Sequence, residues 1–134
     1  MIVVDVNLVA YLLLQSENTD LAEQVFNRDA EWFGPVLWRS EFRNILVNYL
    51  HRKLLTLENA RLIMDKAHAL FDDHEYFVSS EQVLELAASS GCTAYDCEYV
   101  ALARQFGLAL ITFDRDILQH FPEIAKSPQD FLNG

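Results

Sequence analysis

Two acidic residues, Asp96 and Asp114, flank a helix-and-strand unit that is expected to bring them together. Thr93 and Asp96 have the spacing of a helix-start capping box, and Gly107 follows the last apolar residue of the helical period. Residues 108–111 are wholly apolar, which predicts a short buried strand. About ten residues of helix rise roughly 15 Å, and the strand returns about 16 Å. The two acids should therefore lie close together.

Two further acids occupy comparable junctions in the sequence. Asp5 follows the β-branched run at residues 2–4, which predicts a central parallel strand. Glu41 lies early in a helix expected at about residues 36–50, after a short strand expected at residues 31–33. Helix starts in such α/β units lie at the carboxyl ends of strands, where ligands usually bind. We therefore expect one edge of the sheet to gather Asp5, Glu41, Asp96 and Asp114.

Four carboxylates at one edge repel one another, and some of them hold protons when no cation is present. A hard divalent cation removes this repulsion, since Mg²⁺ binds oxygen ligands, takes few carboxylates and keeps waters for phosphate oxygens. Two such ions can activate water and stabilise the leaving oxygen in phosphodiester hydrolysis. No Ser, Cys or His nucleophile constellation competes with this interpretation. Taken singly, Asp5 fits a helix cap, Asp96 a capping box, Asp114 or Asp116 the start of a helix, and Glu41 a solvated surface position, but these explanations leave their joint placement unexplained.

The elements that must position these acids alternate along a chain of 134 residues, a length that suits one domain. Further helices are expected at residues 8–14, 56–70 and 79–91, and a strand is expected at residues 76–78. Another helix should begin at a cap formed by Thr19 or Asp20 and end near residue 28. Pro122 and Pro128 are expected to break up the tail, residues 123–134. The alternation predicts an α/β/α fold of three layers around a short, mostly parallel sheet.

Composition excludes several classes of protein. The formal net charge of −10 argues against a broad basic surface, so any phosphate contacts would come from a local strip. The start of the chain lacks a basic signal region, and no stretch approaches a membrane span, so we expect a cytoplasmic protein. Cys92 and Cys97 are expected to be core residues, and no histidine has the spacing of a zinc ligand. The cations available for a strip are Arg39, Arg43, Arg52, Lys53, Arg104 and Arg115.

As a set, these motifs resemble the PIN domain, and the compact form resembles VapC-type toxins of toxin–antitoxin pairs. The resemblance covers nearly the whole chain. One departure is Val6, which stands where a hydroxyl is often found. The matching residues are Asp5-Val6-Asn7, Glu41 with Asn44, Thr93-Ala94-Tyr95-Asp96 before Val100-Ala101-Leu102-Ala103, and Thr112-Phe113-Asp114.

The resemblance implies an endoribonuclease that cuts RNA with Mg²⁺ or Mn²⁺ held by the four acids. Asn7 and Thr112 would be supporting polar groups, and Asp116 would be an extra ligand. The position of Asn44 one turn after Glu41 also suits a supporting amide that orients the carboxylate. The resemblance further implies a homodimer that is silenced by a cognate antitoxin, whose tail enters the acidic site.

Two other functions stay open at this point. A receiver-like or phosphatase-like domain could accept a phosphoryl group on Asp5. Against it, the residue two positions on is Asn7 rather than a second acid, and no Lys follows the late strand near Asp114. A catalytically silent PIN-like module could keep the fold and only bind a partner, although such a module has no need of four costly charges.

Overall fold

The computed structural model describes residues 1–134, and its five strands form one sheet. The order across the sheet is β3-β2-β1-β4-β5, and every neighbouring pair is parallel. The expected three-layer α/β/α fold is confirmed, and the sheet is wholly rather than mostly parallel. The strands are β1 (Ile2–Val4), β2 (Trp32–Pro35), β3 (Glu75–Tyr76), β4 (Leu110–Ile111) and β5 (Ala125–Lys126).

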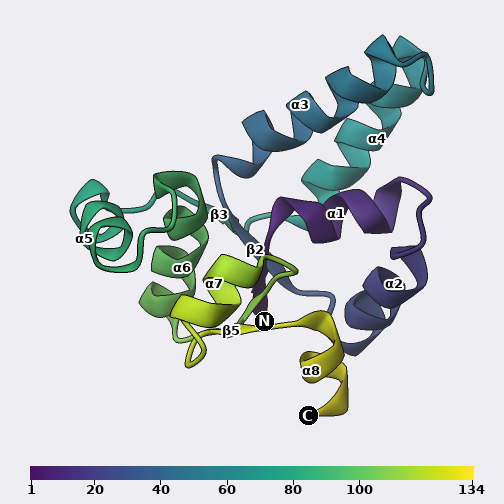
Figure 1. Cartoon of the computed structure of the whole chain (residues 1–134). Coiled ribbons are helices and arrows are strands. Elements are labelled where there is room, and N and C mark those ends of the chain that lie inside the picture. The colour runs from purple at the N-terminus through teal and green to yellow at the C-terminus, as the bar shows by residue number, and fades with distance from the viewer.

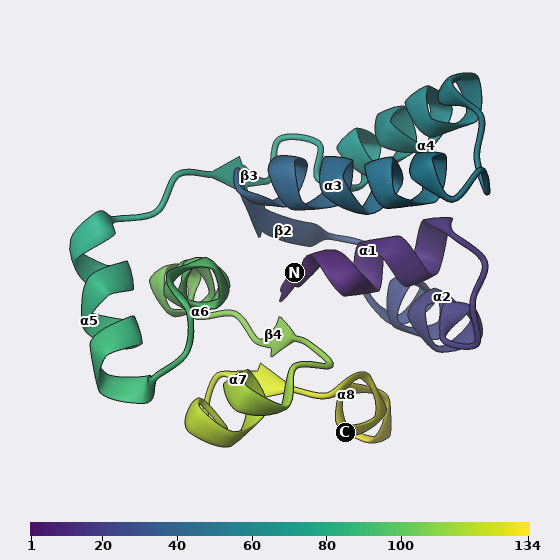
Figure 2. The same cartoon turned by 45° about the horizontal axis from the view of Figure 1, so that its top comes forward.

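Eight helices surround this sheet. Figure 2 shows α5 and α6 on one side of the strands and α1 to α4 on the other, and α6 contacts β1, β2 and β4 directly. The α3–α4 hairpin projects from the body of the molecule (Figure 1). None of the helices combines the length and the apolar character that a membrane crossing requires. The helices are α1 (Val6–Leu13), α2 (Thr19–Arg28), α3 (Trp38–His51), α4 (Leu57–Leu70), α5 (Ser80–Ser90), α6 (Ala94–Phe106), α7 (Arg115–His120) and α8 (Pro128–Asn133).

The hydrophobic core lies around β1, β4 and α6. Both strands are buried along their whole length, as expected for central parallel strands. The helix α6 buries one continuous face that includes Cys97 and Val100. Cys92 is also buried, and neither cysteine forms a disulfide. The prediction that both cysteines are core residues is therefore confirmed.

Several local predictions hold because they rest on capping. The side chains of Thr56, Ser79 and Thr93 each accept a hydrogen bond from a backbone N–H in the first turn of the following helix. Gly107 ends α6 with φ of +64°, the left-handed conformation that glycine adopts without a steric penalty. The start of α2 differs, because the hydroxyl of Thr19 is buried and donates to the Tyr11 carbonyl oxygen at 2.7 Å. The prediction of a side-chain cap at Thr19 or Asp20 was therefore wrong.

Three of the predicted strands have different bounds in the structure, and β4 covers only Leu110–Ile111 of the run at residues 108–111. Gly34 and Pro35 belong to β2 rather than opening a helix, and Pro35 is tolerated because the bonds to β3 come from the N–H groups of its neighbours, Gly34 and Val36. The strand β3 begins one residue earlier than predicted and leaves Phe77 87% exposed. The tail is not irregular, since it forms β5 and α8. Pro128 occupies the first turn of α8, where its missing N–H has no helical partner to lose.

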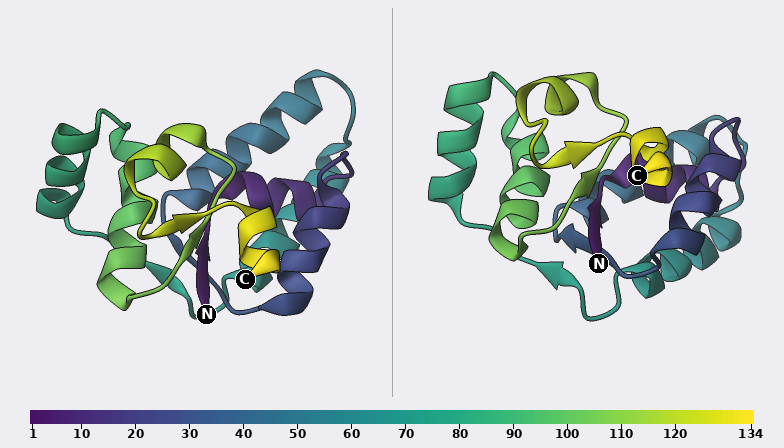
Figure 3. Two further views of the ribbon diagram at one scale, coloured as in Figure 1. Left: turned by 60° about the horizontal axis from the view of Figure 1, so that its bottom comes forward. Right: turned by 90° about the horizontal axis from the view of Figure 1, so that it is seen from below.

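The end of the chain packs against an early helix. Figure 3 shows α8 beside α2, and the guanidinium of Arg28 donates to the carbonyl oxygens of Phe131 and Leu132 at 3.0 and 2.6 Å. The strand β5 is held by the N–H groups of Leu110 and Thr112, which donate to Ile124 and Lys126. The tail therefore completes the edge of the sheet next to β4.

Gly34→Ala is expected to lower the free energy of unfolding by about 1–3 kcal/mol. An added Cβ would lie 2.7 Å from Cε1 of Phe71. Phe71 is fully buried and packs against Trp38 with ring centroids 4.6 Å apart, so its ring has no free space to enter. Urea denaturation measures the change, and adding Phe71→Leu to the variant should recover part of the loss. Wild-type stability in Gly34→Ala would show that the core yields at this point.

Candidate active site

The register of the two central strands places Asp5 beside Thr112. Val3 pairs with Leu110 and Val4 pairs with Ile111, so the next residue of each chain leaves the sheet at the same edge. This edge is also the switch point of the topology, because β1 leads toward β2 on one side while β4 leads toward β5 on the other. Ligands of open α/β sheets bind at such points.

Asp5 is buried, with 6% of its surface exposed, and each of its carboxylate oxygens accepts a hydrogen bond. Oδ1 accepts from the backbone N–H groups of Asn7 and Leu8 at 3.0 and 3.2 Å, and Oδ2 accepts from the hydroxyl of Thr112. Burial raises the pKa of Asp5 to about 6, because the charged form loses water, and these hydrogen bonds offset only part of the rise. The charge of Asp114 adds to the rise.

Thr112 also connects Asp5 to Asp114. Its hydroxyl oxygen accepts from the backbone N–H of Asp114 at 3.0 Å while its hydrogen is donated to Asp5. Asp114 caps α7, with Oδ1 accepting from the N–H groups of Asp116 and Ile117 at 2.8 and 3.1 Å. Thr112 is therefore a buried link that fixes the spacing of the two aspartates.

Asp96 lies in the first turn of α6, behind the cap that Thr93 provides. It is half-buried, and burial raises the pKa of its carboxyl group. The charges of Asp114 and Asp116 raise it further, whereas hydrogen bonds with Thr93 lower it. Asp96 and Asp114, at the two ends of the helix-and-strand unit, are therefore close enough for the charge of Asp114 to act on Asp96.

Glu41 lies in the first turn of α3 and is also half-buried. Its Oε1 accepts a hydrogen bond of 2.6 Å from the hydroxyl of Tyr99, which lies on α6. Burial raises the pKa of Glu41, the Tyr99 hydrogen bond lowers it, and the charges of Asp5, Asp96 and Glu98 raise it again. Glu41 thus faces two of the other acids from a separate helix.

A salt-linked network fixes the helix that carries Glu41. The guanidinium of Arg39 donates two hydrogen bonds to Glu75 at 2.7 Å each, and the indole N–H of Trp38 donates to the same carboxylate. Glu75 belongs to β3, so the network ties the first turn of α3 to the edge of the sheet. The bonds to Arg39 hold the pKa of Glu75 below its usual value. Arg39 is therefore engaged and is not available for a phosphate strip.

The acid cluster, defined here as Asp5, Glu41, Asp96 and Asp114, has no basic partner. The salt bridges of the chain join other groups: Met1 to Asp29, Arg39 to Glu75, and His74 to Glu31. The charges within the cluster raise the pKa values of Asp5, Glu41 and Asp96, yet no three His, Cys, Asp or Glu side chains form a ready group of metal ligands. Carboxylate oxygens without a basic partner are nevertheless the donor set that a hard divalent cation fits.

The other predicted site residues lie at the margin of this cluster. Asn7 is exposed and contributes its backbone N–H to Asp5, with no hydrogen bond from its side chain. Asn44 is exposed, and no hydrogen bond joins it to Glu41, so the orienting amide is replaced by Tyr99. Asp116 is exposed and acts on Asp96 through its charge.

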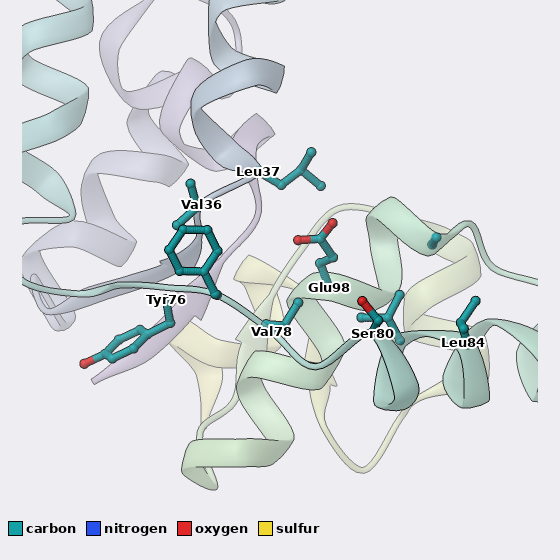
Figure 4. Close-up of a pocket in the computed structure, with 10 residues that line it drawn as sticks. Val36, Leu37, Tyr76, Val78, Ser80, Leu84 and Glu98 are labelled. Atoms are coloured by element: carbon teal, nitrogen blue, oxygen red, sulfur yellow. The ribbon is translucent and has the colours of Figure 1, made fainter.

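An apolar groove adjoins the acid cluster. It has a volume of about 520 Å³ and runs between the start of α3, the β3–α5 connection and α5. Figure 4 shows the side chain of Glu98 reaching from α6 into this groove, on the side of Leu37. Glu98 is the only charged residue that lines the groove, and its charge also acts on Glu41. None of the four acids of the cluster lines the groove, so Glu98 is the residue that relates the groove to the cluster, through its charge.

Comparison with known proteins places this geometry in context. Residues 2–126 match the model of the PIN domain. The chain is 30% identical over 126 residues to "Ribonuclease VapC3" of Pyrobaculum aerophilum, covering 92% of this chain and 96% of the relative.

Two solved structures share the fold of this chain. The FitAcB structure of Neisseria gonorrhoeae has a TM-score of 0.72 at 17% identity and covers 96% of this chain and 99% of its own. A toxin–antitoxin complex of Klebsiella pneumoniae has a TM-score of 0.69 at 14% identity, with 96% and 98% of the two chains covered.

Proposed function

The chain belongs to the PIN domain family, and on this premise we propose that it is a metal-dependent endoribonuclease that hydrolyses RNA phosphodiester bonds. The observation that carries the proposal is the acid cluster, which lies unpaired at the switch point between β1 and β4. The relative that is named a ribonuclease covers nearly the whole chain, which supports the choice of RNA as substrate.

The residues of the cluster have two proposed roles. Asp5, Asp96 and Asp114 would hold Mg²⁺ or Mn²⁺, and Thr112 keeps Asp5 and Asp114 at a fixed spacing. The bound cation would supply water of lowered pKa and a counter-charge for the leaving oxygen. Glu41 completes or orients the site and accepts a proton, a task that its raised pKa favours. Asn7, Asn44 and Asp116 surround the site as exposed polar groups.

The phosphotransfer alternative has less support from the site. Residues 2–126 match the PIN domain, and no Lys follows β4 near Asp114 as a receiver-like site would require. The silent binding module remains a matter for experiment.

Cleavage of RNA is expected only when a divalent cation is present, and excess chelator should stop it. The test incubates the purified protein with a mixed RNA pool in Mg²⁺, Mn²⁺ or EDTA and maps new ends by sequencing. Ends that appear with either metal and vanish in EDTA support the proposal. The same ends in EDTA would contradict metal dependence.

We further propose two protein partners. A cognate antitoxin would insert a cationic side chain into the acid cluster, since the cluster is negative and has no basic partner of its own. The related fold of the Klebsiella toxin–antitoxin complex is consistent with this proposal. A homodimer is supported by the exposed apolar side chains beside the groove, Phe77 and Leu84. Light scattering of the purified chain measures whether it self-associates.

A further inference from the structure

Tyr99 is a buried aromatic residue whose hydroxyl reaches the acid cluster. It lies on α6, three positions after Asp96, with 3% of its surface exposed. Its O–H donates to Oε1 of Glu41 over 2.6 Å, and this bond joins residues 58 positions apart in the chain. In the sequence, Tyr99 is one of the apolar positions of the helical period. Packing in the core explains its aromatic ring but does not explain its hydroxyl.

The hydroxyl of Tyr99 is the donor of this bond, because an ionised carboxylate has no hydrogen to give and only accepts. A buried hydroxyl without a partner would be costly, so the bond to Glu41 also accounts for a polar atom at this depth.

The bond leaves one oxygen of Glu41 unused. Oε1 receives the Tyr99 hydrogen, whereas no protein group donates to Oε2. The exposed Asn44, which lies on the same helix, makes no hydrogen bond that could turn the carboxylate elsewhere. The charges of Asp5 and Asp96 act on Glu41, so its carboxylate is held among the acids by a donor from the opposite helix.

We propose that Tyr99 is a positioning residue of this site: its O–H fixes the Glu41 carboxylate within the acid cluster and leaves Oε2 free to face a divalent cation or its water. The inference rests on the proposed function, because it requires the cluster to bind a cation. Partners of this kind, which orient a metal-site carboxylate without touching the metal, typically contribute 10–100-fold in affinity or activity.

Tyr99→Phe and Tyr95→Phe form a matched pair of variants. Both remove one hydroxyl from the first half of α6, but Tyr95 is 63% exposed and its hydroxyl makes no hydrogen bond. Calorimetric titration with MnCl₂ should show Mn²⁺ affinity about 10–100-fold lower in Tyr99→Phe and unchanged in Tyr95→Phe. A purely structural bond between α3 and α6 would lower the melting temperature but leave Mn²⁺ affinity unchanged, and that result would overturn the proposal.

A double variant shows whether the hydroxyl acts through Glu41. Glu41→Gln should weaken Mn²⁺ binding, and adding Tyr99→Phe to it should cause no further loss, because the two groups act as one unit. Losses that add in full would overturn the proposal. If the wild type binds Mn²⁺ and Tyr99→Phe binds it with the same affinity, the role of Tyr99 is rejected and the metal-dependent function is not. A wild type that binds no Mn²⁺ rejects the inference together with the metal-dependent function.

Discussion

Asp96→Asn is expected to lower the rate of RNA cleavage by more than about 100-fold while the fold stays intact. Loss of a group that only orients a metal ligand typically costs 10–100-fold, and a direct ligand should cost more. Asparagine keeps the size of Asp96 and can still accept a hydrogen bond from Thr93, so the start of α6 should be preserved. The half-buried carboxylate, however, loses the charge that a divalent cation requires.

The chain offers a close control for this variant. Asp130 has the same position in α8 that Asp96 has in α6, and its N–H donates to the Ser127 hydroxyl at 3.1 Å, as that of Asp96 does to Thr93. Asp130→Asn should cleave RNA at the wild-type rate. Circular dichroism checks the fold of both variants. Cleavage by Asp96→Asn at the wild-type rate would remove Asp96 from the site.

Asp5→Asn is expected to make the metal-free protein more stable than the wild type at pH 7, by up to about 3 kcal/mol. The pKa of Asp5 is about 6 in the folded chain against 3.8 as its ordinary value. Between pH 4 and 6 the folded chain therefore keeps a proton that the unfolded chain has released. Since the folded state binds more protons, the stability of the wild type falls as the pH rises through this window and levels off above it.

Asparagine carries no charge at any pH, so it does not share this loss. Urea denaturation in EDTA at several values between pH 4 and 7 should show the two proteins converge near pH 4 and separate above it. Glu41 and Asp96, whose pKa values are also raised, are present in both proteins, so the difference reports the ionisation of Asp5 together with its effect on Glu41. Saturating Mn²⁺ should reverse the order, because it stabilises only a folded chain that binds it. A difference that does not depend on pH would contradict the burial of an ionising Asp5.

The positions of Asp5 and Asp114 were predictable because each follows an apolar run that forms a central strand. The register of the two strands then brings Asp5 to Thr112, and helix capping brings in Asp96. The position of Glu41 was predictable because it lies at the start of α3, and helix starts in α/β units lie at the carboxyl ends of strands. These predictions rest on local patterns that the tertiary structure reinforces.

Other features were not predictable, because no local pattern encodes them. The two-residue strand β5 has no period and exists through its hydrogen bonds to β4. The helical spacing that suggested Asn44 as a partner of Glu41 ignored the face on which it lies, which is exposed. Tyr99 was hidden among apolar positions, and Arg39 is paired with Glu75 instead of facing a phosphate. Each of these depends on residues distant in sequence.

The central claim, that the acid cluster binds a divalent cation, is tested most directly by calorimetric titration of MnCl₂ into the wild type, Asp5→Asn and Asp96→Asn. This measurement needs no knowledge of the RNA target, which a selective nuclease would otherwise demand. Saturable binding to the wild type, weakened by both substitutions, is the expected result. No binding to the wild type at millimolar Mn²⁺, or equal affinity in all three proteins, would contradict it.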